Sequence, residues 1–169
     1  MFHKKYRSYE FVSQSELTAA CLDNLILLFN SKENKKPGVI LGGRNSALNT
    51  TIEDVGPVIV KQYTRGGFIS HFIKQRYFFE KKKRGNIEFE FLVNAEKAGV
   101  SVPKPFAHAS LGSWVYKAWL ITRKIENAQN FIEICLNDLK KATGFLPEIS
   151  ENINKLITAS IHHIDLHPG

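Results

Sequence analysis

Two charged residues, Lys61 and Glu88, are of the types that can bind and orient a phosphate group. Lys61 ends the apolar, β-branched run 58–60, so a strand would direct its ammonium to one face of a sheet, where it could bind phosphate. A carboxylate such as Glu88, on the helix that follows, would keep that ammonium directed at phosphate. Glu90 lies on a different side of the same helix, so only one of the two carboxylates can face the sheet. Lys61 could also be a solvated edge residue, because lysine is mostly exposed.

The end of the chain contains a cluster of histidines around Asp165. Asp165 could act as a general base that accepts a hydrogen bond from an attacking hydroxyl and orients it. The same cluster could bind a metal ion, because His162, His163 and His167 are also potential ligands. His163 and His167 are four residues apart, but Pro168 indicates that they do not share one continuous helix. We therefore favour a catalytic loop and keep a metal site as the alternative.

A glycine turn separates two predicted strands near the middle of the chain. The apolar run 39–41 ends at Gly42 and Gly43, and the run 58–61 forms the second strand. Backbone amides at the two glycines could cradle the phosphates of a nucleotide, since no Cβ limits the approach.

A long segment after the second strand is predicted to be mainly helical. It covers residues 68–98, contains no proline and has a predicted break near Gly85. Gly99 is well placed to cap the helix at its C-terminus. Residues 100–105 are then predicted to be extended, because Pro103 and Pro105 restrict the residues before them.

The remainder of the chain predicts a hairpin and then two amphipathic helices. The hairpin covers residues 106–122, turns at Gly112 and is buried over the end of its second strand. Apolar residues recur at helical spacing in 132–139 and again in 149–161. We expect these two apolar faces to be partly exposed.

The order of these elements is that of a protein-kinase-like N-lobe, so the predicted fold class is α+β, with an antiparallel sheet, a helix on it and the first helices of a C-lobe. A capping box at Ser13–Glu16 predicts a helix of about four turns before residue 30. The predicted domains are an N-terminal helical extension (1–37), the kinase N-lobe (38–126) and a partial C-lobe that ends in the catalytic loop (127–169).

In such a lobe, Thr122 would be the gatekeeper residue beside the nucleotide. The segment from Arg123 to Ile125 would be the hinge, which binds adenine through backbone groups. Together with Gly42, Gly43, Lys61 and Glu88, these residues form the predicted nucleotide site.

Charge and composition limit the partners of the protein. The net charge of +7 and the pI near 9.4 call for an anionic partner, which could be nucleic acid, a phosphorylated small molecule or an acidic lipid surface. The basic run 81–84 follows the aromatic residues 77–79, a combination found where proteins rest on membrane headgroups, although it could also be a solvated face. Cys21 and Cys135 form no zinc or disulfide pattern, which favours a cytoplasmic setting. We expect neither export nor a membrane span.

Several short motifs carry a resemblance to a known family over residues 38–169. They are the segment Val-Lys-Gln-Tyr-Thr-Arg-Gly-Gly at 60–67, Arg76-Tyr77, Glu88-Phe89 and Val-Pro-Lys-Pro at 102–105. They resemble the Kdo kinase family of lipopolysaccharide inner-core synthesis, where Kdo is 3-deoxy-D-manno-octulosonic acid. The most specific part is the strand lysine followed by Tyr-x-Arg-Gly-Gly, which general protein kinases lack.

The resemblance implies transfer of the γ-phosphate of ATP to a hydroxyl of Kdo or heptose on a lipid A precursor, at the cytoplasmic face of the inner membrane. It implies that Lys61 is a phosphate ligand, Glu88 its partner and Asp165 the catalytic base. ATP and Mg²⁺ are the implied cofactors, and the metal ligands are expected beyond Gly169, so this chain alone is expected to be inactive.

The implied partners are a Kdo-lipid A type acceptor and an anionic membrane surface, with no nucleic acid. One alternative is another atypical kinase, such as a heptose, aminoglycoside or Rio-like protein kinase, because these share the lysine, glutamate and His-x-Asp elements. The other alternative is a non-catalytic basic module that binds RNA or membranes.

Overall fold

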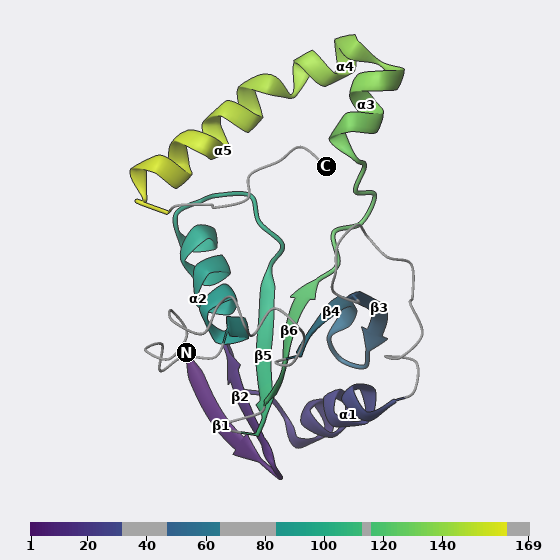
Figure 1. The fold of residues 1–169 in the computed structure, drawn as a ribbon, viewed down its shortest axis with the longest axis vertical. Coiled ribbons are helices and arrows are strands. Elements are labelled where there is room, and N and C mark those ends of the chain that lie inside the picture. Colours follow the sequence, from purple (N-terminus) through teal and green to yellow (C-terminus); the bar gives the residue numbers. More distant parts are fainter. Residues whose placement is uncertain (32–46, 65–83, 113–115, 162–169) are drawn as a thin grey trace, which may run out of the picture. The chain divides into compact units, whose positions relative to one another are not determined.

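The structure is a computed structural model that describes residues 1–31, 47–64, 84–112 and 116–161. The elements in chain order are β1 (Phe2–Tyr6), β2 (Tyr9–Ser13), α1 (Ala19–Asn30), β3 (Ala47–Ile52), β4 (Gly56–Thr64), α2 (Arg84–Lys97), β5 (Pro105–Leu111), β6 (Lys117–Arg123), α3 (Phe131–Asn137), α4 (Leu139–Gly144) and α5 (Leu146–Thr158) (Figure 1). They divide into two compact units, one of residues 1–90 with 104–124 and one of residues 91–103 with 125–169. The predicted α+β fold class is confirmed.

The first unit is built on an antiparallel sheet. Among the described residues, six strands pair in the order β1-β2-β5-β6-β4-β3. In register, Lys61 of β4 lies opposite Leu120 of β6, which lies opposite His108 of β5. Because side chains alternate between the faces of a sheet, these three residues share one face. The predicted strand 58–61 and the predicted hairpin are both confirmed, with the buried residues 118–122 in β6.

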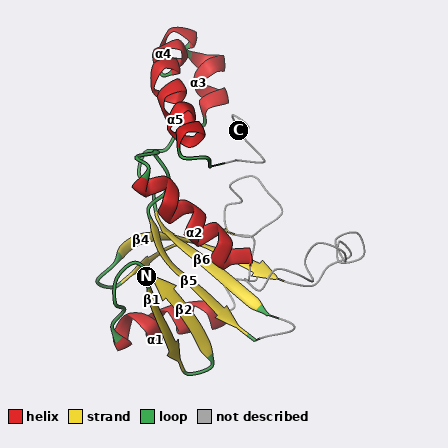
Figure 2. Ribbon diagram, turned by 90° about the vertical axis from the view of Figure 1, so that its left-hand side faces the viewer, coloured by secondary structure: helices red, strands yellow, loops and turns green. Residues whose placement is uncertain are grey.

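Helix α1 covers the other face of this sheet, while the first turns of α2 lie on the face that carries Lys61 (Figure 2). Val58 and Val60 of β4 and Trp119 of β6 point toward α1 and are almost fully buried. Phe29 of α1 stacks on Trp119 with ring centroids 4.3 Å apart and an interplanar angle of 14°. This aromatic core keeps β4 and β6 rigid beneath the Lys61 face, since large buried rings dominate the stability of such cores.

The N-terminal segment differs from the prediction, because residues 2–13 form the hairpin of β1 and β2. The predicted capping box is wrong: the N-cap of α1 is Thr18, whose hydroxyl accepts from the Cys21 amide at 3.2 Å. Ser13 instead ends β2 opposite Ala107, and its hydroxyl donates to the Ser15 carbonyl at 2.6 Å. The hairpin joins the sheet along β5, so the strands begin much earlier in the sequence than the periodicity indicated.

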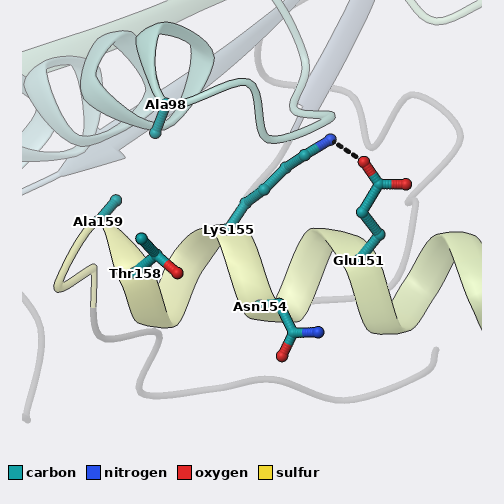
Figure 3. Close-up of a pocket in the computed structure, with 6 residues that line it drawn as sticks. All are labelled: Ala98, Glu151, Asn154, Lys155, Thr158 and Ala159. Carbon is teal, nitrogen blue, oxygen red and sulfur yellow. Dashed lines mark ion pairs between the residues drawn. The ribbon is translucent and has the colours of Figure 1, made fainter.

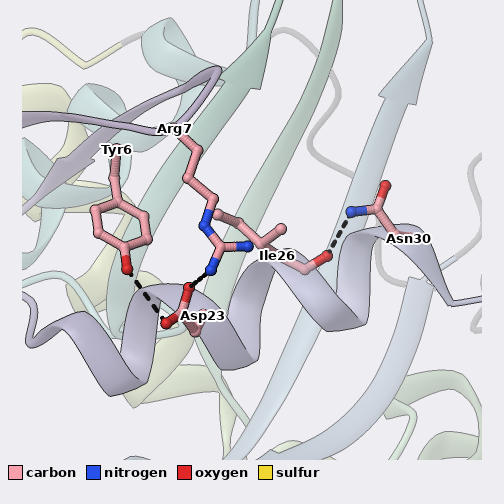
Figure 4. Close-up of polar contacts among 5 residues, drawn as sticks. All are labelled: Tyr6, Arg7, Asp23, Ile26 and Asn30. Atoms are coloured by element: carbon pink, nitrogen blue, oxygen red, sulfur yellow. Dashed lines mark hydrogen bonds and ion pairs between the residues drawn. The ribbon is translucent and has the colours of Figure 1, made fainter.

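Polar contacts fasten this hairpin to α1 (Figure 4). The Tyr6 hydroxyl donates to Asp23 at 3.2 Å, and the Arg7 guanidinium pairs with the same carboxylate at 2.7 Å. Near the end of α1, the Asn30 side-chain amide donates to the Ile26 carbonyl at 2.9 Å. These contacts therefore join the turn of the β1–β2 hairpin to α1.

Helix α2 ends as the sequence predicts. Gly99 has a φ of +74°, which a residue with a Cβ rarely adopts. Its amide donates to the Glu96 carbonyl and the Val100 amide to the Ala95 carbonyl, each at 3.0 Å. These two bonds form a Schellman motif, so the predicted C-cap is confirmed. The predicted helical residues 68–83 lie within the range 65–83, outside the described residues.

The second unit contains two short helices where the sequence predicted one. Asp138 separates α3 from α4, because its backbone leaves helical geometry and its carboxylate accepts from the Lys141 amide at 2.9 Å. Asp138 is therefore an N-cap, which the apolar periodicity alone did not reveal. Helix α5 is confirmed, although it ends before Ile161. The expected exposure is also confirmed: Leu136 is 81% exposed and Ile157 is 69% exposed. Within the described residues, no helix is both long and apolar enough to cross a bilayer.

The two cysteines should differ in reactivity. Cys21 is 6% exposed, and its burial is the main cause that raises the pKa of its thiol. Since the thiolate is the reactive form, Cys21 should react at least tenfold more slowly than the partly exposed Cys135 with a thiol reagent at pH 8. Peptide mapping of the labelled chain over time measures this, and unfolding in urea should equalise the two rates. Equal rates in the folded chain would show that α1 opens readily.

Candidate functional site

The predicted ion pair between Lys61 and Glu88 is present. The Lys61 ammonium lies 2.8 Å from Glu88 Oε1, and both side chains are 34% exposed. Lys61 is directed to this face by the alternation of β4, and Glu88 reaches it from the second turn of α2. A pair with this exposure contributes at most about 1 kcal/mol to stability, because water screens it. The pair therefore contributes little to stability, and what matters is where it places a cation on the sheet.

The competing carboxylate, Glu90, has a different partner. Its Oε1 accepts from the Asn86 side-chain amide on the same helix at 3.2 Å. Asn86 and Glu90 are one turn apart, so this contact runs along α2. Glu88 is thus the helix carboxylate that pairs with Lys61, as the helical register predicted.

Tyr63 completes the arrangement around the ion pair. Its hydroxyl donates to Glu88 Oε2, the carboxylate oxygen that Lys61 does not bind. The Lys61 ammonium also lies 5.0 Å from the centroid of the Tyr63 ring, within the range of a cation–π contact. Both oxygens of Glu88 are therefore held, one by a cation and one by a phenol.

Close packing of α2 on the sheet brings Glu88 within reach. A Cβ on Gly85 would lie 2.8 Å from Cδ2 and 2.9 Å from Nε2 of His108, and 3.4 Å from the Tyr63 ring. His108 is itself 2% exposed in the middle of β5. Gly85 is therefore the residue whose lack of a side chain allows this approach. The predicted break near Gly85 lies at the edge of the described residues, where α2 is described from Arg84 onward.

The predicted gatekeeper and hinge residues lie at the end of β6 and directly after it. Thr122 lies opposite Ile59, so it shares the face of Lys61, and it is 9% exposed. Arg123 points to the other face, where its guanidinium lies 5.4 Å from the Phe106 ring centroid. Its amide donates to the Lys104 carbonyl at 2.8 Å, so this amide is already paired. Ile125 follows in the second unit and is 55% exposed.

Three predicted site residues, Gly42, Gly43 and Asp165, lie outside the described residues. The alternative metal cluster around Asp165 lies in the same undescribed C-terminal range. Within the described part of the chain, no group of three or more His, Cys, Asp or Glu side chains could hold a metal ion. The described part of the site is thus the Lys61 ammonium, held by a carboxylate on one face of the sheet.

Sequence reasoning missed the contributions of Tyr63, Gly85 and His108. Tyr63 could have been found from the strand alternation, because it stands two residues after Lys61 and must share its face. Gly85 and His108 meet across a helix and a strand, 23 residues apart, and no local pattern marks such a contact.

The second unit has a pocket of its own that contains none of these residues (Figure 3). It has a volume of about 370 Å³ and is lined by Ala98 and by residues of the last turns of α5 with Ala159. Lys155 and Glu151 pair beside it at 2.7 Å, and the hydrogen bond from Lys155 lowers the pKa of Glu151. This contact is an ordinary surface pair one helical turn apart.

Comparison with known proteins places the chain in a family. The chain matches the lipopolysaccharide kinase (Kdo/WaaP) family over residues 35–169. It is 31% identical to 3-deoxy-D-manno-octulosonic acid kinase of Vibrio parahaemolyticus over 117 residues, 68% of this chain and 49% of that protein. It is 36% identical to the protein of the same name from Haemophilus influenzae over 115 residues, 64% of this chain and 46% of that protein. No solved structure matches the chain significantly.

An antiparallel sheet, a helix on one of its faces and a lysine–glutamate pair between them define the first unit as a protein-kinase-like N-lobe. The chain belongs to the lipopolysaccharide kinase (Kdo/WaaP) family. It spans about half the length of the curated relatives that it matches.

Proposed function

We propose that this protein transfers the γ-phosphate of ATP to a hydroxyl of a Kdo sugar in a lipopolysaccharide inner-core or lipid A precursor. The observation that carries the proposal is the ion pair of Lys61 and Glu88 at 2.8 Å on the sheet face. Phosphoryl transfer depends mainly on positioning and on electrostatic stabilisation, and a held lysine supplies both to the phosphates of ATP. Membership of the family and the names of the relatives supply the acceptor.

The nucleotide is proposed to bind on the Lys61 face of the sheet. Lys61 would hold the α- and β-phosphates, and the backbone amides of Gly42 and Gly43 would cradle the phosphates from the glycine turn. Thr122 shares the face of Lys61 and would line the base pocket as the gatekeeper. The backbone groups that meet adenine would come from the Arg123 carbonyl and from Ile125.

Asp165 is proposed as the catalytic base. It would accept the proton of the acceptor hydroxyl as the oxygen attacks the γ-phosphorus in line with the leaving ADP oxygen. Mg²⁺, when bound, supplies charge neutralisation between the β- and γ-phosphates. The described residues offer no ligand set for this ion, so no residue of the described part is assigned to it.

The site of action is proposed to be the cytoplasmic face of the inner membrane, with the protein bound peripherally. The net charge of +7 favours an anionic lipid surface, and the acceptor itself carries acidic sugars. We propose no nucleic-acid partner. The domain boundaries at 37/38 and 126/127 remain predictions.

The test is transfer of labelled γ-phosphate from ATP to Kdo-lipid A in mixed micelles. We would assay the 169-residue chain, a protein extended to the length of its relatives, and the extended protein with Asp165→Asn. We expect label on the lipid only with the unmodified extended protein. Label on protein or on an aminoglycoside instead of the lipid would indicate another atypical kinase. Salt-sensitive RNA binding without any effect of ATP would indicate a basic binding module.

A further inference from the structure

Tyr63 contacts both members of the Lys61–Glu88 pair. It stands two residues after Lys61 on β4, so the two side chains share a face of the sheet. Its hydroxyl donates to Glu88 Oε2, while the Lys61 ammonium binds Oε1 at 2.8 Å and lies 5.0 Å from the Tyr63 ring centroid. Each of the three side chains therefore contacts the other two.

Tyr63 is the fixed member of this group. It is 5% exposed, whereas the side chains of Lys61 and Glu88 are 34% exposed. Its ring packs against the first turn of α2, 3.4 Å from the place of a Cβ on Gly85. A tyrosine ring also has only two side-chain torsions to fix, whereas lysine and glutamate have more to lose.

A partly exposed ion pair does not hold its own geometry well, because water screens it and two flexible side chains must be ordered. The charge-assisted hydrogen bond from the buried Tyr63 hydroxyl fixes the Glu88 carboxylate independently of Lys61. If a nucleotide draws Lys61 toward its phosphates, Glu88 keeps its place because the phenol still holds Oε2.

We propose that Tyr63 is a positioning residue that holds Glu88, so that the carboxylate keeps Lys61 directed toward the phosphates of ATP. This inference rests on the proposed function and adds a residue to it. Tyr63 contacts neither nucleotide nor acceptor in this scheme, and it acts through Glu88 alone.

The kinetic test is Tyr63→Phe in the extended protein. Phenylalanine keeps the ring, its packing and the cation–π contact, and removes the hydroxyl that donates to Glu88. We expect the KM for ATP to rise about threefold to tenfold with kcat within twofold of the unmodified protein. A loss of folded protein would instead lower kcat and leave KM unchanged, and this result would overturn the inference.

Tyr6→Phe is the matched control, because the Tyr6 hydroxyl also donates to a carboxylate, that of Asp23, at the hairpin. We expect it to leave both KM and kcat unchanged. In a Glu88→Ala background, Tyr63→Phe should raise KM by less than twofold, since the acceptor of its hydrogen bond is then absent. The same fold-change in both backgrounds would overturn the inference.

Acylation of Lys61 in the 169-residue chain separates this inference from the proposed function. Mass spectrometry of the lysine peptides should show Lys61 modified about threefold faster in Tyr63→Phe, with no change in Tyr6→Phe. An unchanged rate in Tyr63→Phe would overturn the inference while the proposed function stands. In the unmodified extended protein, ATP should protect Lys61 from acylation. Failure of ATP to protect Lys61 there would overturn the proposed function, even where Tyr63→Phe raises the acylation rate and so supports the positioning role.

Discussion

Replacing Lys61 with methionine in the extended protein should lower kcat/KM for ATP by about a thousandfold. Methionine is similar in length and keeps the packing of β4, but it removes the cation that Glu88 holds at 2.8 Å. The phosphates of ATP then lose a positive charge that is fixed in place before binding. The stability of the sheet should change little, because the lost ion pair is one-third exposed and worth at most about 1 kcal/mol.

Two further variants show whether the effect belongs to this position. Lys61→Arg should not restore the rate, because a planar guanidinium cannot place a point charge where the ammonium lies. Lys117→Met removes an exposed lysine at the start of β6 and should leave the rate unchanged. If the rate of phosphate transfer by Lys61→Met lies within threefold of the unmodified protein, Lys61 does not bind the phosphates of ATP. Labelled phosphate transfer to Kdo-lipid A, with thermal melts for each variant, provides the measurement.

The sequence predicted those parts of the fold whose signals are local. The run at 58–61 has branched apolar residues that suit a buried strand, and Gly99 supplies the positive φ that a helix end requires. The hairpin of β1 and β2 was not predicted, because its stability depends on pairing with β5, about a hundred residues away. The polar spacing at Ser13 resembled a helix cap, but Ser13 is committed to the sheet, and Thr18 takes that role.

The candidate site shows the same division between local and distant signals. Lys61 and Glu88 were predicted because a strand and a helix each repeat their side chains at a fixed period. One face of the helix must therefore lie on one face of the sheet. The spacing of 27 residues between them carries no information by itself. Gly85 was noted only for its effect on helix continuity. Its contact with His108 depends on how closely α2 lies on β5, which is a property of the folded protein.

The second prediction with a large effect concerns this contact. Gly85→Ala should lower the free energy of unfolding by about 1–3 kcal/mol through overpacking, because the new Cβ would lie 2.8 Å from the His108 ring. His108 is 2% exposed, so its ring has little room to move aside. Alanine normally stabilises a helix relative to glycine by about 0.5–1 kcal/mol, so the clash must exceed that gain. We expect the melting temperature to fall by about 2–4 °C per kcal/mol in a chain of this size.

Three comparisons make this expectation specific to the contact. Gly144→Ala at the end of α4 meets no atom within 4 Å and should change the unfolding free energy by less than about 0.5 kcal/mol. Gly99→Ala also meets no atom, but its φ of +74° should cost about 1 kcal/mol. Adding His108→Ala to Gly85→Ala should recover part of the loss, because the methyl group then enters the space that the ring leaves. If Gly85→Ala raises the melting temperature as in an ordinary helix, α2 does not lie this close to β5, and the reach of Glu88 to Lys61 needs another explanation.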